Sequence, residues 1–179
     1  MPDNFKARAE EAAAALMQKL SSSSCTLALS ESCTAGLVSD LLACIPGASA
    51  VLWGSFVCYT EEAKISMLGI EREKIASYGL VSGEVASLMA LGALEKSGAN
   101  AAAGVTGLAG PSGDGSNVPV GTVWAAAVYR PASQLPSGEG AGVFKEVKEF
   151  HFSGSRNEVR IQAAIAVLEL LDKILHTHG

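Results

Sequence analysis

Apolar residues along the 179-residue chain change repeatedly between helical and extended spacing. Residues 4–20 are rich in Ala, Leu, Met, Glu, Gln and Lys, a composition that predicts a helix. "CTLALS" at 25–30 is a short apolar run that predicts a buried strand. Helix-like residues follow over 34–44, until "IPG" ends them. Val, Trp, Phe and Tyr in "AVLWGSFVCY" at 50–59 favour a second strand.

The rest of the chain repeats this alternation. A glycine ends each of two short helical patterns, and the last strand alternates apolar and polar residues as a half-exposed strand does. "PASQLPSGEGAG" at 131–142 is interpreted as an ordinary surface loop. Further helices are predicted over 61–69, 71–79, 83–97 and 154–176, and further strands over 101–107, 120–130 and 143–152.

Alternating strands and helices predict an α/β fold. We expect a three-layer α/β/α domain with a mixed, mostly parallel sheet and helices on both faces. The chain contains no internal repeat and no stretch typical of a linker, so residues 1–179 are predicted to form a single domain.

The composition of the chain makes some classes of protein function less expected than others. Hydrophobic residues make up 49% of the chain and charged residues 17%, which is typical of a globular protein with an ample core. The formal net charge is -5 and the 13 Lys and Arg residues are scattered, so no nucleic-acid partner is expected. No apolar run approaches the roughly 18 residues that a membrane span needs, and the charged N-terminus does not resemble a signal peptide. We therefore expect a cytoplasmic protein without a membrane partner.

Metal and redox chemistry are not indicated. The four cysteines form no C-x-x-C pair, and three of them lie in apolar runs. Two of the three histidines lie within the last four residues, where a chain end tends to fray. No metal and no organic cofactor are expected.

Three loops at predicted strand ends carry the candidate chemistry, because ligands of open α/β sheets gather at such ends. The first is "SESCTAG" at 30–36, which precedes a predicted helix. Backbone N–H groups at a helix start bind anions or a developing oxyanion. The alternative is that Ser32 or Thr34 only caps the helix, as Ser and Thr commonly do.

The second loop is "YTEEAK" at 59–64. No Lys or Arg occurs between Lys19 and Lys64. A lysine alone near buried strands can act as a general base if burial keeps its amine neutral. Glu61 and Glu62 would oppose that change if they lay close to it. The alternative is an ordinary solvated lysine on a helix.

The third loop runs over 106–121 and contains four glycines within 107–115. Glycine-rich backbone can hold a phosphate, but the P-loop lysine and the dinucleotide-binding pattern are both absent. The alternative is that this segment is a flexible loop that binds nothing. Arg156 and Arg160, four residues apart near a helix start, either reach this region or face solvent.

Together these loops resemble the C-terminal domain of the CinA family, the competence-and-damage-inducible proteins. The active members of that family are nicotinamide mononucleotide amidohydrolases, also called PncC-type deamidases. The resemblance covers residues from about 8 to 174. It rests on these stretches, in the family's order: "ESCTAG", "IPGAS", "GSFVCYTEEAK" with "LGI", "GLVSGEVA", "TGLAGP", "PVGTV" and "FSGSRNEVR".

The resemblance implies a hydrolase of the Ser-Lys type that converts nicotinamide mononucleotide to nicotinate mononucleotide and ammonia. Ser32 is then the nucleophile, Lys64 the general base, and Tyr59 a residue that orients or relays the proton. A small-molecule nucleotide is the expected partner, and a homodimer the expected assembly. The implied substrate-binding residues are Thr34, Ala35, Gly36, Ser49, Thr106, Gly107, Gly110 and Arg156.

Two positions depart from the family's pattern. The family often has two glycines after "ESCT", where this chain has Ala35 before Gly36. A lysine commonly precedes the proline of "PVG", where this chain has Val118. These departures leave two alternatives open: a non-catalytic pyridine-nucleotide-binding module that recruits a partner, and an amidase for a related pyridine carboxamide.

Overall fold

The computed structural model describes residues 3–131 and 142–179, and most of the loop predicted over 131–142 lies outside them. Five strands form one sheet in the order β2-β1-β3-β4-β5. β1 pairs in parallel with both β2 and β3, whereas β4 pairs antiparallel with β3 and with β5. β4 is therefore the one strand of this sheet that runs against the other four. The strands are β1 (Leu27–Glu31), β2 (Leu52–Val57), β3 (Ala101–Gly107), β4 (Thr122–Tyr129) and β5 (Phe144–His151).

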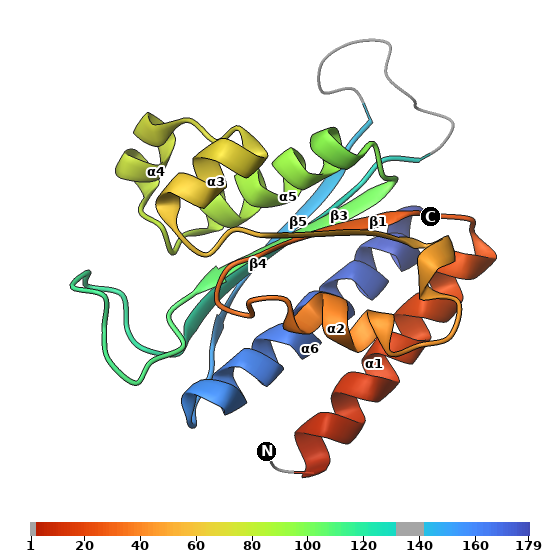
Figure 1. Cartoon of the computed structure of the whole chain (residues 1–179), viewed down its shortest axis with the longest axis horizontal. Helices are drawn as coiled ribbons and strands as arrows, with labels where there is room; N and C mark the ends of the chain where they lie inside the picture. The colour runs from red at the N-terminus through yellow and green to blue at the C-terminus, as the bar shows by residue number, and fades with distance from the viewer. Residues whose placement is uncertain (1–2, 132–141) are drawn as a thin grey trace.

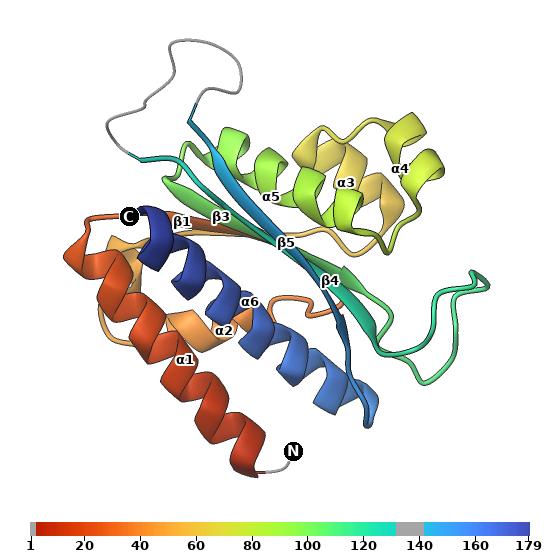
Figure 2. The same ribbon diagram turned by 180° about the vertical axis from the view of Figure 1, so that it is seen from behind.

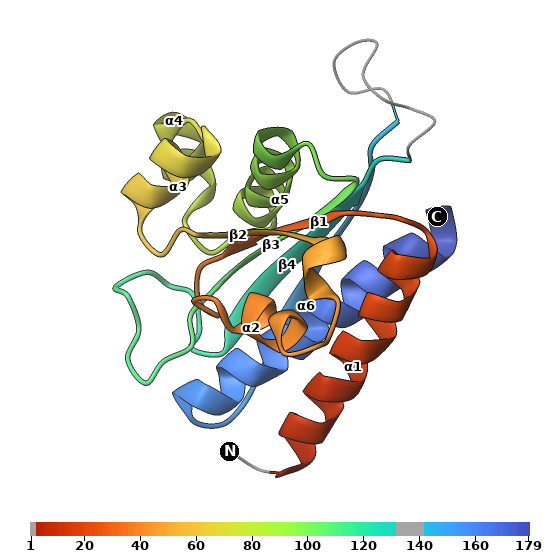
Figure 3. The ribbon, with the colours of Figure 1, turned by 45° about the vertical axis from the view of Figure 1, so that its right-hand side comes forward.

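Helices cover both faces of the sheet (Figures 1 and 2). One face carries α1, α2 and α6, and the other carries α3, α4 and α5, so the molecule has three layers (Figure 3). The bounds are α1 (Asp3–Ser22), α2 (Leu37–Ala43), α3 (Glu61–Leu68), α4 (Arg72–Tyr78), α5 (Gly83–Ser97) and α6 (Arg156–His178), with a short 3-10 helix, η1 (Ala48–Ala50), before β2.

Side-chain alternation along the strands builds a separate core on each face. In β3, Ala101, Ala103 and Val105 pack with α1 and α6. Ala102 lies between them in sequence and packs with α5. This alternation follows from the period of two in a strand, and it explains why the central strands read as unbroken apolar runs: both of their faces are covered.

Gly104 allows α5 to lie directly on β3. A Cβ atom at this position would lie 2.4 Å from the carbonyl oxygen of Ala86 and 2.6 Å from the backbone nitrogen of Ala90. We expect Gly104→Ala to lower the free energy of unfolding by about 1–3 kcal/mol, because backbone atoms of the helix would have to move. Gly113→Ala is the control, since nothing lies within 4 Å of the Cβ it would add. Urea unfolding of both variants measures the difference, and equal midpoints would contradict the expectation.

The predicted α/β fold with a mixed sheet and helices on both faces is confirmed. The prediction that most of the sheet is parallel holds for strand direction, although only two of the four pairings are parallel. The sequence did not predict η1. Over residues 3–131 and 142–179, no helix combines the length and the apolar character needed to cross a bilayer.

Candidate active site

Ser32 lies directly after β1, at the carboxyl end of the three parallel strands. Its backbone N–H donates to the carbonyl of Val105 on β3 (3.0 Å), which holds the start of the loop against the sheet. The Ser32 residue is 7% exposed. This nucleophile candidate is therefore held at the point where β1, β2 and β3 end together.

The carboxylate of Glu31 holds the loop over residues 30–36 in place through hydrogen bonds. It is fully buried and accepts hydrogen bonds from the backbone N–H groups of Gly36 (2.9 Å), Val38 (3.0 Å) and Ser39 (3.0 Å). The hydroxyls of Ser39 and Ser55 donate to it as well, at 2.9 and 3.1 Å. The negative end of the side chain thus meets the positive end of α2, which is a favourable arrangement.

The expectation that Ser32 or Thr34 caps this helix is wrong. The N-cap position of α2 is Gly36, which has no side chain, and Glu31 takes the free N–H groups instead. A carboxylate is acceptor-only and offers more lone pairs than one hydroxyl, so it satisfies several donors at once. The N–H groups of Gly36 and Val38 are therefore not available to a ligand.

Ala35 has a left-handed backbone conformation, with a φ angle of 50°. A residue with a Cβ atom is strained there, and glycine is not. We expect Ala35→Gly to raise the free energy of unfolding by about 0.5–1 kcal/mol, after allowing for glycine's larger unfolded-state entropy. The control is Ala43→Gly, at an exposed position within α2, which should have the opposite sign. Urea unfolding measures both, and a destabilised Ala35→Gly variant would contradict the strain.

Lys64 reaches the same place from α3. Thr60 caps this helix by accepting a hydrogen bond from the N–H of Ala63 (3.1 Å). The Lys64 side chain then turns inward and is only 1% exposed. Its Nζ lies 3.0 Å from Ser32 Oγ and 3.0 Å from the carbonyl oxygen of Cys58. The alternative of a solvated lysine is therefore wrong.

Burial lowers the pKa of Lys64 below its ordinary value, because the charged form loses its hydration. Cys58 and Cys33 oppose this change in pKa when their thiols are ionised, and Glu61 opposes it less. Arg72 pairs with both Glu61 and Glu62 at 2.9 and 2.6 Å. No carboxylate oxygen of the described residues forms an ion pair with Lys64. The surroundings of this amine therefore favour its neutral form.

The neighbouring thiols do not supply a counter-charge. Burial raises the pKa of Cys33 to about 12 and that of Cys58 to about 11. Both groups are then uncharged at neutral pH. Because the thiolate is the nucleophilic form of cysteine, Cys33 is a poor competitor for Ser32 although it lies next to it.

A cleft of about 190 Å³ opens at this point. Six of the predicted site residues lie in its wall: Ser32, Tyr59, Lys64, Thr106, Gly107 and Arg156. The remaining wall residues, which were not predicted as site residues, are Cys33, Leu80, Val81, Leu108, Ala109 and Asp114.

Arg156 spans the mouth of the cleft. Its Nη1 donates to the carbonyl of Gly110 (2.7 Å) and its Nη2 to the hydroxyl of Tyr59 (2.5 Å). The capping box of Ser155 and Glu158 starts α6 and places this arginine in the first turn. Arg160, one turn later, donates to the carbonyl of Thr34 (2.7 Å). Both arginines therefore reach the site region, which settles the alternative left open by their spacing.

Thr106 and Thr34 differ in their partners. The Thr106 hydroxyl donates to the carbonyl of Leu80 (2.8 Å) and ties β3 to the segment before α5. Thr34 Oγ1 is buried and has no hydrogen-bond partner among the described residues. Thr34, Ala35 and Gly36 are not part of the cleft wall, so their contribution is to hold the loop that carries Ser32.

Ser49 is not brought to the cleft within this chain. It is exposed on η1, which leads into the amino end of β2. The cleft lies at the carboxyl ends of the parallel strands, so the sheet separates the two. Sequence order alone could have indicated this, because Ser49 precedes β2 whereas Tyr59 follows it.

Asp114 is a cleft residue that sequence reasoning missed. Hydrogen bonds from the hydroxyl and N–H of Ser116, at 2.6 and 2.9 Å, lower the pKa of its carboxyl group, so it is charged at neutral pH. The wall therefore contains both an anion, Asp114, and a cation, Arg156. Among the residues described, no three metal-ligating side chains gather into a cluster.

The fold and this site define an α/β domain with a buried lysine next to a serine at the carboxyl edge of its sheet. Residues 9–175 match the model of the CinA C-terminal domain, and the chain belongs to that family.

Curated relatives carry the same domain in longer chains. A CinA-like protein of Syntrophomonas wolfei is 39% identical over 153 residues, which is 86% of this chain and 34% of that protein. A CinA-like protein of Anaeromyxobacter is 43% identical over 145 residues, 81% of this chain and 33% of that protein. This chain thus spans about a third of the length of these relatives.

Solved structures share the fold over nearly the whole chain. The competence/damage-inducible protein CihA of Agrobacterium tumefaciens has a TM-score of 0.81 at 34% identity, with 94% of this chain and 96% of that chain covered. A CinA superfamily protein of Escherichia coli has a TM-score of 0.82 at 29% identity, with 93% and 90% covered.

Proposed function

We propose that this domain is an amidohydrolase of the Ser-Lys type that releases ammonia from the carboxamide of a pyridine nucleotide. Nicotinamide mononucleotide is the substrate that the family resemblance implies, and nicotinate mononucleotide the product. The observation that carries the proposal is the 3.0 Å separation between Ser32 Oγ and the buried Nζ of Lys64.

The first step forms an acyl-enzyme. With Lys64 neutral, the same separation lets the Ser32 hydroxyl donate its proton to Nζ as Oγ attacks the carboxamide carbon. The backbone N–H group of Cys33, a residue of the cleft wall, follows the nucleophile and bonds to no backbone carbonyl of the described residues. It is the donor we propose for the oxyanion, where one such donor is typically worth about 2.7–4 kcal/mol.

The C–N bond of the tetrahedral intermediate then breaks: the Lys64 ammonium gives its proton to the departing nitrogen, ammonia leaves, and Ser32 carries the acyl group as an ester. In the second step, the neutral Lys64 takes a proton from the water that attacks this ester. The carboxylate product departs, and the proton returns to Ser32 Oγ. This scheme requires no metal and no organic cofactor.

Substrate recognition rests on the charges of the cleft wall. A pyridine mononucleotide carries a positive ring and a negative phosphate. We propose that Arg156 attracts the phosphate and that Asp114 attracts the ring. The hydroxyl of Tyr59 bonds to Arg156, so we assign it to positioning that arginine beside the substrate.

Ammonia release from nicotinamide mononucleotide, measured on the wild type and on Ser32→Ala, tests the proposal. Turnover by the wild type that is lost in the variant supports a serine amidohydrolase. If the nucleotide raises the melting temperature of the wild type but no ammonia is released, the result supports the non-catalytic binding module instead. Activity on nicotinamide but not on the mononucleotide identifies a related pyridine carboxamide as the substrate.

A cytoplasmic homodimer is the assembly we propose for this domain. The edge strand β2 supports it, because Trp53 and Val57 are 52% and 43% exposed and the strand's outer edge has no partner within the described chain. Exposed edge strands of this kind pair readily with another chain. Sedimentation equilibrium tests the assembly, and a monomer at all concentrations contradicts it.

A further inference from the structure

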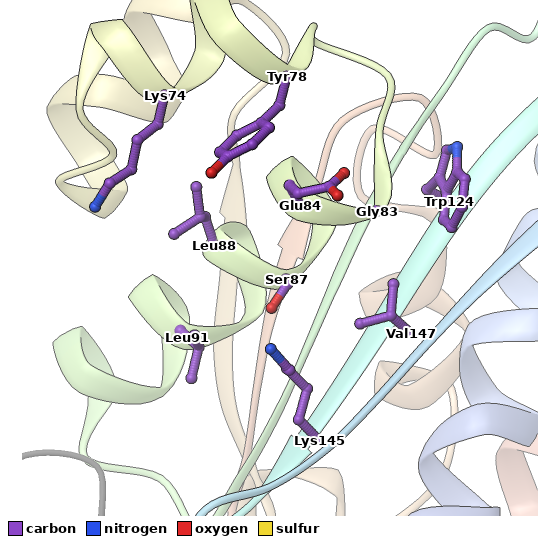
Figure 4. Close-up of a pocket in the computed structure, with 10 residues that line it drawn as sticks. All are labelled: Lys74, Tyr78, Gly83, Glu84, Ser87, Leu88, Leu91, Trp124, Lys145 and Val147. Atoms are coloured by element: carbon purple, nitrogen blue, oxygen red, sulfur yellow. The ribbon is translucent and has the colours of Figure 1, made fainter.

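A second cavity of about 440 Å³, more than twice the volume of the active-site cleft, lies on the α5 face of the sheet. Its volume falls in the range of small-molecule sites. We call it the α5 groove. Figure 4 shows its wall, in which the residues that matter here are Tyr78, Ser87, Leu88, Leu91, Trp124 and Lys145.

One part of the α5 groove is built to hold an apolar or aromatic group. Trp124 packs directly on the start of α5, where a Cβ atom added to Gly83 would lie 2.8 Å from its ring. Tyr78, at the end of α4, is 50% exposed and faces the same space. Leu88 lies below the ring of Tyr78, on the side away from Trp124 (Figure 4). The aliphatic side chain and the aromatic ring above it favour a flat or extended apolar body.

The other part of the groove is polar. Ser87 is 7% exposed and lies in the wall of the groove, and Lys145 is exposed to solvent. The Lys145 side chain, from β5, points toward the Ser87 hydroxyl (Figure 4). No described carboxylate pairs with Lys145, whereas Lys74, in the same wall, pairs with Glu71 at 2.8 Å. An ammonium that points toward a hydroxyl in the same wall suits a carboxylate.

Glu84 is the one acidic residue of this wall. Its carboxylate points toward Trp124 and away from Ser87 (Figure 4). The carboxylate of Glu84 therefore lies on the Trp124 side of the wall, and the ammonium of Lys145 lies beside Ser87. An anionic group is then favoured beside Lys145 rather than beside Glu84.

We propose that the α5 groove is a binding site for a small amphipathic carboxylate. The carboxylate group lies between Lys145 Nζ and Ser87 Oγ, and the apolar body extends along Leu88 toward Tyr78. This site is separate from the cleft of Ser32, and it does not depend on the proposed amidohydrolase activity.

The two cavities share one segment of chain. Tyr78 and Gly83 line the groove, whereas Leu80 and Val81 between them line the active-site cleft. The carbonyl of Leu80 also accepts the hydrogen bond of the Thr106 hydroxyl. A ligand in the groove therefore contacts, through its apolar body, the same chain segment that forms one side of the active-site cleft.

Trp124 provides a direct readout. The only other tryptophan, Trp53, is exposed on β2, so Trp53→Phe leaves Trp124 as the single reporter. We expect 4-phenylbutyrate to change its fluorescence in a saturable way, and the uncharged 4-phenylbutanol to bind about 10-fold more weakly. Equal affinity for the acid and the alcohol, or no response to either, overturns the proposal.

Variants locate the binding in the groove. Lys145→Met removes the charge, keeps most of the side-chain volume and should weaken 4-phenylbutyrate binding about 10-fold. Lys148→Met, an exposed lysine of the same strand outside the groove wall, and Arg156→Met, in the active-site cleft, should leave the affinity unchanged. Circular dichroism and melting temperature confirm that each variant folds. Wild-type affinity in Lys145→Met, or lost binding in Arg156→Met, overturns the assignment.

Discussion

Replacing Lys64 with methionine is expected to lower kcat for ammonia release by about 10⁴-fold, the size of effect seen when one member of a catalytic pair is removed. Methionine keeps most of the length and the apolar stem of the side chain, so most of the packing around α3 is retained. Ser32 then has no base within hydrogen-bond distance of its Oγ. Steady-state kinetics with nicotinamide mononucleotide measure the loss.

The pH dependence distinguishes a base from a merely structural lysine. Burial lowers the pKa of Lys64, so the neutral amine is present at lower pH than for an ordinary lysine. We expect kcat/KM to rise with pH on an acid limb set by this lowered pKa. A lysine that needed its charge would give the opposite slope.

Stability should follow the same titration. Between the lowered pKa of the folded state and the ordinary value of 10.5, the unfolded chain binds a proton at Lys64 that the folded chain does not. The free energy of unfolding of the wild type, relative to Lys64→Met, should therefore rise with pH through this window, by at most about 1.4 kcal/mol per pH unit. A difference that is flat or falls with pH contradicts a neutral Lys64. Lys74→Met, on the exposed surface of α4, is the control.

Replacing Glu31 with alanine is expected to lower the free energy of unfolding by about 3 kcal/mol, because a helix cap is lost and buried donors are left unpaired. The N–H groups of Gly36, Val38 and Ser39 all lose their acceptor at once. The loop that holds Ser32 is attached to these groups, so turnover should fall as well. Urea unfolding measures the first effect and ammonia release the second.

Glu31→Gln tests whether the charge or only the shape matters. The amide keeps one acceptor oxygen but turns an NH₂ group toward backbone donors, so we expect an intermediate loss of stability. Glu62→Ala, at an exposed position of α3, is the control and should change the unfolding midpoint little. A Glu31→Ala midpoint equal to that of Glu62→Ala would show that the anchor is dispensable.

The sequence predicted the elements well where one signal dominated. Glycine ended α3 and α4 as expected, and the apolar runs of β3 and β4 could be placed because both faces of these strands are covered. The pairing of Ser32 with Lys64 came from family resemblance, since 32 residues separate them in the chain. Only the meeting of β1 with the end of β2 brings them to 3.0 Å.

The positions that sequence reasoning missed depend on three-dimensional direction. Glu31 appeared to be one more polar residue in a hydroxyl-rich loop, and nothing in its spacing showed that it faces inward under α2. Asp114 lies in a glycine-rich stretch whose path over the cleft is set by the turn from β3 to β4. Ser49 was assigned to the site by resemblance, and the sheet places it at the opposite edge.

The reversed direction of β4 has a consequence for how this domain can diverge. Because β3 and β4 are antiparallel, the segment between them is a hairpin connection that needs no crossover helix. Such a connection tolerates insertions, deletions and exchange of residues without loss of the surrounding sheet. Asp114 and Gly110 belong to this segment, whereas Ser32 and Lys64 are held by β1 and α3. Under the proposed function, the residues that contact the substrate can therefore be exchanged between relatives, or by an engineer grafting loops, while the proposed pair of Ser32 and Lys64 stays in place.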